Sequence, residues 1–124
     1  MRRLALALAA LLLALLALPA PAHHGVFFTR DEQIRIEGPV VKPLTGNPHF
    51  EIEVQDGDTR WEIDLGNPYR IERAGLAWNG SDMPIGRRIA VEGFPSVTGT
   101  MLEARTVWID GEPHRLFAED EPKY

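Results

Sequence analysis

Apolar and polar side chains alternate along several short segments of the chain, and this spacing of two residues predicts β-strands. The clearest segments are 50–54 and 61–65, in which apolar residues alternate with mostly acidic ones. Asp56, Gly57 and Asp58 lie between them, and Asp and Gly tolerate the positive φ of a tight turn. The pattern therefore predicts a β-hairpin with one buried and one exposed face.

Further strands are predicted on both sides of this hairpin. The first covers residues 34–41, with an interruption at Gly38-Pro39, and two more cover 89–94 and 101–109. A short edge strand is expected at 114–117. All of these segments are bounded by Gly, Pro, Asn or Asp, as is usual for sheet proteins with short connections.

One short helix is predicted in the middle of the chain. Asn67 has the side chain of an N-cap, Pro68 suits the first helical position, and Gly75 is placed to end the helix. Three strands, a short helix and a closing pair of strands is the layout of a small OB-like five-stranded barrel. The fold class is therefore all-β with one short helix, and a β-sandwich is the alternative.

The first 22 residues have the pattern of a secretory signal peptide. Arg2 and Arg3 form a basic start, residues 4–18 contain only Leu and Ala, and small residues precede a cleavage point after Ala22. The apolar run of 15 residues is shorter than the roughly 20 residues that a membrane-spanning helix needs. We expect the leader to be cleaved and the protein to be periplasmic or secreted, with no membrane span afterwards.

Cleavage of the leader leaves enough chain for one domain. We expect this domain over residues 23–117, followed by an acidic, flexible tail at 118–124. Without Arg2 and Arg3, 11 of the 13 basic side chains remain against 18 acidic ones. A chain with this acidic balance and no basic stripe is not expected to bind nucleic acid. It has no cysteine, so neither disulfides nor thiolate ligands contribute.

The candidate chemistry lies in the histidines. Cleavage after Ala22 gives His23 a free α-amino group. This amine and the ring Nδ1 of His23 can chelate one metal ion. The imidazole of His24 would supply a third nitrogen ligand. Nitrogen-rich sites of this kind suit Cu(II). Cleavage after Ala20 would instead put a histidine third in the chain, which is another amino-terminal chelate for copper or nickel.

His49 is the third candidate metal ligand. It ends the sequence Asn47-Pro48-His49, where Pro48 restricts the backbone on both sides of the preceding peptide bond. This turn follows the first strand, at one of the two loops that OB-type barrels commonly use for binding. Two alternatives stay open, because the paired histidines also fit a solvated tail and His49 also fits a structural turn residue.

Other residues give weaker signals. His114 is expected to have no functional role, and Trp61 and Trp108 are interpreted as packing residues on strands. The sequence contains no nucleophile motif, phosphate-binding loop or zinc-protease motif. We therefore expect no catalytic residues and no enzyme.

These motifs together resemble a known family. The residues that carry the resemblance are His23-His24, Ile34, Ile36, Gly38, Val40, Asn47-Pro48-His49, Trp61-Glu62-Ile63, Arg73-Ala74-Gly75-Leu76, Gly86 and Val91-Glu92-Gly93-Phe94-Pro95. In this pattern the chain resembles the bacterial exported proteins of DUF6152. The resemblance implies a small periplasmic β-protein in which three histidines matter, and it implies no activity. Thr45-Gly46 departs from the family, which often has an aromatic or acidic residue before Asn-Pro-His.

The sequence favours an exported metal-binding module. Copper is the expected ion, His23, His24 and His49 are the expected ligands, and carriage or buffering is the expected role. The alternative is a metal-free OB-like module that binds a protein or small ligand in the envelope, with a groove on the 50–65 hairpin near Trp61 and Tyr69.

Overall fold

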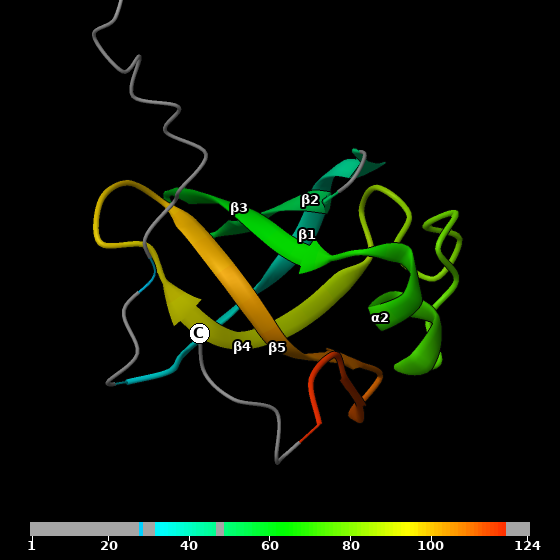
Figure 1. Cartoon of the computed structure of the whole chain (residues 1–124). Helices are drawn as coiled ribbons and strands as arrows, with labels where there is room; N and C mark the ends of the chain where they lie inside the picture. Colours follow the sequence, from blue (N-terminus) through cyan, green and yellow to red (C-terminus); the bar gives the residue numbers. More distant parts are fainter. Residues whose placement is uncertain (1–27, 29–31, 47–48, 119–124) are drawn as a thin grey trace, which may run out of the picture.

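The structure is a computed structural model that describes residues 28, 32–46 and 49–118. Within them six strands and one short helix follow one another (Figure 1). Their bounds are β1 Ile34–Thr45, β2 Phe50–Asp56, β3 Thr59–Gly66, α2 Pro68–Arg73, β4 Arg88–Pro95, β5 Met101–Ile109 and β6 Glu112–Arg115.

The sheet closes into a barrel. The strands are hydrogen-bonded in the order β3-β2-β1-β4-β5-β6, and β3 also pairs in parallel with β5. That parallel pairing runs from Glu62 opposite Met101 to Asp64 opposite Glu103. Five strands therefore form a closed barrel with β6 as an addition, which confirms the predicted barrel and not the sandwich.

The alternating apolar positions fill the interior. On the predicted hairpin Ile52, Val54, Ile63 and Leu65 are fully buried, and Trp61 packs against the same core from a partly buried position. Their acidic neighbours on β2 and β3 lie on the outer face, with intermediate exposure. The hairpin therefore has one apolar and one polar face, as its sequence predicts.

Strand β1 is continuous across Gly38-Pro39, where the sequence pattern predicts an interruption. Residues Ile34–Pro39 pair with β4, and from Val40 onward the strand pairs with β2. Gly38 lies where β1 passes β2, and a Cβ built on it would be 1.7 Å from the carbonyl oxygen of Gln55. The glycine marks a close approach between two strands and not a break.

Helix α2 begins as predicted. The Asn67 side chain accepts a hydrogen bond from the Arg70 amide at 3.0 Å, and Pro68 occupies the first turn. Only Ile71 of the helix is buried, and it joins the barrel core. Nowhere in the described ranges is there a helix long and apolar enough to cross a bilayer.

Strand β6 extends the sheet beside α2. It starts two residues earlier than predicted, because Asp110 and Gly111 both have positive φ and form a two-residue turn between the paired residues Ile109 and Glu112. The next buried residue along the chain, Leu116, belongs to the core. The predicted edge segment is therefore partly strand and partly core.

Candidate functional site

The structure describes one of the three predicted metal ligands. His49 lies just before β2 with 68% of its side chain exposed, whereas His23 and His24 lie outside the described residues. The Nδ1 atom of His49 is 3.5 Å from Oδ2 of Asp64. This distance is longer than an optimal hydrogen bond, and it places a carboxylate beside the ring.

Strand register explains why these two residues meet. The start of β2 pairs with the end of β3, with Phe50 opposite Gly66 and Glu51 opposite Asp64. Asp64 is itself fixed, because its Oδ1 accepts a hydrogen bond from the Gly66 amide at 2.8 Å. One carboxylate oxygen is thus held by the backbone while the other faces the His49 ring.

This geometry matches the environment of many metal-binding histidines. Such histidines usually present one ring nitrogen to a carboxylate or carbonyl, which orients the ring and leaves the other nitrogen for the metal. With Nδ1 of His49 facing Asp64, Nε2 is the nitrogen left for a ligand. The sequence gives little sign of Asp64's part, since its alternation with Ile63 and Leu65 indicates only a solvated position.

More carboxylates surround Asp64 on the outer face of the hairpin. Glu53 contacts Lys42 at 3.4 Å and also forms an ion pair with Arg60. Burial raises the pKa of Glu53, but the hydrogen bonds and charges of Arg60 and Lys42 outweigh it, so the pKa is lowered. This carboxylate is already neutralised by two cations.

Glu62 is in a different electrostatic situation. A hydrogen bond with Glu51 raises the pKa of Glu62, and burial and the negative charge of Glu51 raise it further. Two carboxyl groups in such contact favour a state in which one of them holds a proton. The outer face of the hairpin therefore carries the carboxyl pair Glu51 and Glu62 beside Glu53, which Lys42 and Arg60 neutralise.

The described residues do not form a complete metal site. Among them no three His, Asp or Glu side chains are placed to hold one ion. His49 and Asp64 supply one imidazole and one carboxylate. Any fuller set of ligands would need residues outside the described ranges, which include His23 and His24.

The remaining candidates have structural positions. Nδ1 of His114 lies 3.0 Å from the carbonyl oxygen of Ala74, so this ring links β6 to the end of α2. Trp61 packs against the core, and Tyr69 on α2 is 68% exposed with the Arg73 guanidinium 5.7 Å from its ring centre. The outer face of the hairpin, where the alternative hypothesis places a binding groove, carries Glu51, Glu53, Glu62 and Asp64.

The fold and the loop histidine define a small OB-like barrel with a histidine and a carboxylate at one end. The family model described as "Family of unknown function (DUF6152)" matches residues 10–104, and the chain belongs to that family. No curated protein matches the chain.

One similar solved chain comes from the crystal structure of TiaS in complex with an isoleucine tRNA, AMPCPP and agmatine, with 11% sequence identity and a TM-score of 0.48. That match covers 71% of this chain, and this chain spans about a fifth of that one, 21% of its length.

Proposed function

We propose that this protein is an exported metal-binding module of the periplasm that carries or buffers copper without catalysing a reaction. The observation that supports it is the exposed ring of His49, with Nδ1 facing the fixed carboxylate of Asp64 and Nε2 left for a ligand. His23, through its amine and ring, and His24 would supply the other nitrogens. A set of several nitrogens with one imidazole held by a carboxylate suits Cu(II).

The position of Phe28, the described residue nearest His23 and His24 in the sequence, supports the proposal that these histidines can reach His49. Phe28 pairs with Ser96, the Ser96 amide donates to the Met101 carbonyl at 2.8 Å, and Met101 pairs with Glu62. The distance from Phe28 to Asp64 therefore comprises three strand-to-strand spacings across the sheet and two residues along β3. With ordinary strand dimensions this is roughly 16 Å.

The length of chain between the histidines and Phe28 is sufficient for that distance. The chain takes four Cα-to-Cα steps from His24 to Phe28 and five from His23, and fully extended it covers about 14 Å and about 17 Å in these steps. The lengths of the imidazole side chains add to this reach. Contact with His49 is thus compatible with the anchor at Ser96.

Titration of Cu(II) tests the proposal directly. The protein is expressed from its full-length sequence, recovered from the periplasm, and its N-terminus is determined by sequencing. We expect a start at His23 and one equivalent of Cu(II) bound with submicromolar affinity, with nitrogen hyperfine structure in the EPR spectrum. Replacement of His49 by Ala should weaken binding at least tenfold and change the EPR parameters.

The matched control removes a different imidazole. His114→Asn keeps a side-chain nitrogen near the Ala74 carbonyl and leaves the barrel end with His49 untouched, so its Cu(II) affinity should equal that of the native protein. Micromolar or weaker binding, or equal affinity of the native and His49→Ala proteins, would refute the proposal.

A further inference from the structure

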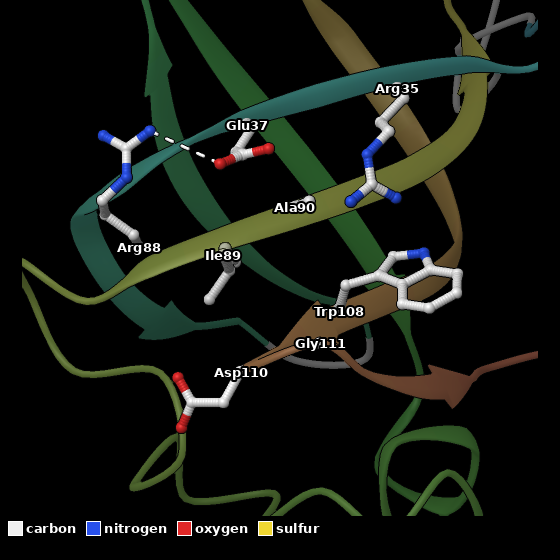
Figure 2. Close-up of a pocket in the computed structure, with 8 residues that line it drawn as sticks. All are labelled: Arg35, Glu37, Arg88, Ile89, Ala90, Trp108, Asp110 and Gly111. Atoms are coloured by element: carbon white, nitrogen blue, oxygen red, sulfur yellow. Dashed lines mark ion pairs between the residues drawn. The ribbon is translucent and has the colours of Figure 1, made fainter.

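A second surface feature lies away from the histidine end, on the outside of β1, β4 and β5. It is a hollow with a volume of about 210 Å³ (Figure 2). The residues on which its chemistry depends are Arg35, Glu37, Arg88, Ala90, Trp108 and Asp110. Neither the sequence motifs nor the proposed copper site involves this surface.

The register of three strands creates the hollow. Ala90 of β4 lies opposite Glu37 of β1 on one side and opposite Trp108 of β5 on the other. Its neighbours Ile89 and Val91 belong to the packed core cluster and Ala90 does not, so its methyl group lies on the outer face, where neighbouring side chains leave only 5% of the residue exposed. A small residue between two large ones leaves a depression in the sheet surface.

Trp108 forms an aromatic wall of this hollow. In Figure 2 its indole ring is seen nearly face-on, with Arg35 above it and Ala90 beside it. The Arg35 guanidinium carbon is 5.2 Å from the ring centre. The face of an indole is electron-rich and attracts cations such as this guanidinium, and also weakly positive hydrogens such as the C–H groups on one side of a sugar ring, so a sugar on this face would lie beside Arg35.

The polar groups around the hollow are balanced in charge, and each takes part in an ion pair. The lining includes Arg35, Arg88, Glu37 and Asp110, which carry two positive and two negative charges. Arg88 lies 3.5 Å from Glu37, and both line the hollow. Arg35 and Asp110 pair with residues that do not line it: Arg35 lies 2.8 Å from Glu92, and Asp110 lies 2.6 Å from Arg87.

These ion pairs leave hydrogen-bonding capacity unused. A guanidinium has five N–H donors and a carboxylate accepts about four hydrogen bonds, whereas each ion pair uses only part of this. The Nε1–H group of Trp108 has no hydrogen-bond partner in the part of the chain that the structure describes, but it is buried, so the donors open to a ligand are those of the guanidinium groups. Donors and acceptors therefore line the hollow, with Arg35 nearest the indole ring and Arg88 and Asp110 on the side away from it (Figure 2).

This combination selects a class of ligand. An anion would meet Glu37 and Asp110, a cation would meet Arg35 and Arg88, and an apolar ligand would cover charged groups without pairing them, which is unfavourable. A neutral ring with many hydroxyl groups can both donate and accept. A cavity of about 150 Å³ holds a benzene ring, so this larger hollow has room for a six-membered ring with hydroxyl substituents.

We propose that the hollow beside Trp108 binds one neutral pyranose ring, which stacks on the indole and hydrogen-bonds to the surrounding guanidinium and carboxylate groups. The ring can be a free monosaccharide or one unit of a longer glycan, because the chemistry of recognition is the same. This site is independent of the copper proposal and uses none of its residues.

The test is an NMR titration of the ¹⁵N-labelled full chain, without added metal, with four neutral probes. These are the methyl pyranosides of glucose, galactose, mannose and N-acetylglucosamine, and cellotriose and chitotriose are added as chain probes. At least one should bind with a dissociation constant near or below about 1 mM and shift the indole N–H signal of Trp108. Glucuronate and glucosamine should bind at least fivefold more weakly than the best neutral probe.

Two variants and a control show whether the hollow is responsible. Trp108→Ala removes the aromatic face, and Ala90→Leu fills the hollow while keeping Trp108 and the ion pairs. Each should weaken binding at least tenfold, and Ala90→Leu decides if Trp108→Ala does not fold. Trp78→Ala removes another tryptophan, 57% exposed and outside the hollow, and should bind within twofold of the native protein.

The proposal is overturned if no neutral probe binds at 20 mM, if a charged sugar binds more tightly than all neutral ones, or if Ala90→Leu binds like the native protein. Tighter binding of a trisaccharide than of its methyl glycoside supports recognition within a glycan chain. Equal binding of the two supports recognition of single rings.

Discussion

Replacing Gly38 by Ala tests how β1 passes β2. The backbone at Gly38 does not have a positive φ, so the position does not need glycine for its conformation. The added Cβ would lie 1.7 Å from the Gln55 carbonyl oxygen and 2.7 Å from its carbonyl carbon. The glycine is required only because a neighbouring backbone occupies the space of a side chain.

The size of the effect follows from this overlap. Real Cβ contacts are essentially never below 3.0 Å, so the strands must separate by at least 1.3 Å, the difference between 3.0 and 1.7 Å. Overpacking of this kind costs about 1–3 kcal/mol, and Ala offsets less than about 1 kcal/mol by restricting the unfolded chain. We expect a net loss of about 1–2 kcal/mol, or a fall in Tm of roughly 4–16 °C for a domain of this size.

Urea and thermal unfolding followed by circular dichroism measure this loss. Hydrogen exchange should also show faster exchange of the β1 and β2 amides. Gly99→Ala is the control, because no atom lies within 4 Å of its added Cβ and its strain comes only from a φ of +80°, so the β1–β2 amides should keep their protection. A Gly38→Ala protein within about 0.5 kcal/mol of the native stability would refute the reasoning.

Three further predictions concern single side chains. Asp64→Asn should lower Cu(II) affinity about 10- to 100-fold by weakening the orientation of His49, as measured by calorimetric titration. Because the pKa of Glu62 is raised in the folded protein above 4.5, its contribution to stability is present below pH 4.5 and is lost as pH rises through the folded value. Glu62→Gln should therefore have a higher Tm than the native protein at pH 7 and lose this advantage below pH 4.5, in thermal scans over pH. Asn67→Ala removes the cap on the Arg70 amide and should cost about 1 kcal/mol in urea unfolding, and an unchanged midpoint would contradict the capping role.

Much of the fold is predictable from the sequence because its signals are local. The alternation in 50–54 and 61–65 sets the two faces of the hairpin, and Asn67-Pro68 sets the start of α2. Gly38-Pro39 is the instructive exception. A glycine that allows a neighbouring strand to approach has the same local pattern as one that ends a strand, and only the tertiary structure separates the two.

The candidate sites are less predictable because they depend on register. His49 stands out through its Asn-Pro-His turn, but Asp64 reaches it only because Glu51 pairs with Asp64 across the hairpin. The hollow depends on Ala90 lying between residues of two other strands that are far away in sequence. No spacing along a single strand encodes that neighbourhood.

The short parallel pairing of β3 with β5 has a consequence for folding. It consists of three residue pairs from Glu62–Met101 to Asp64–Glu103 and joins positions 39 residues apart, 62 and 101. The pairing of β1 with β4 is also distant in the sequence, since Pro39 lies opposite Arg88, whereas the hairpins join neighbouring strands. Such distant contacts must overcome the entropy of loop closure, and they therefore tend to form late. If the β3–β5 pairing were lost first on heating, the barrel would become a curled open sheet with two free edges. Sheet proteins with free edges can pair with one another and aggregate. Three residue pairs, one of which contains the carboxylate beside His49, thus separate the closed barrel from an open sheet with exposed edges.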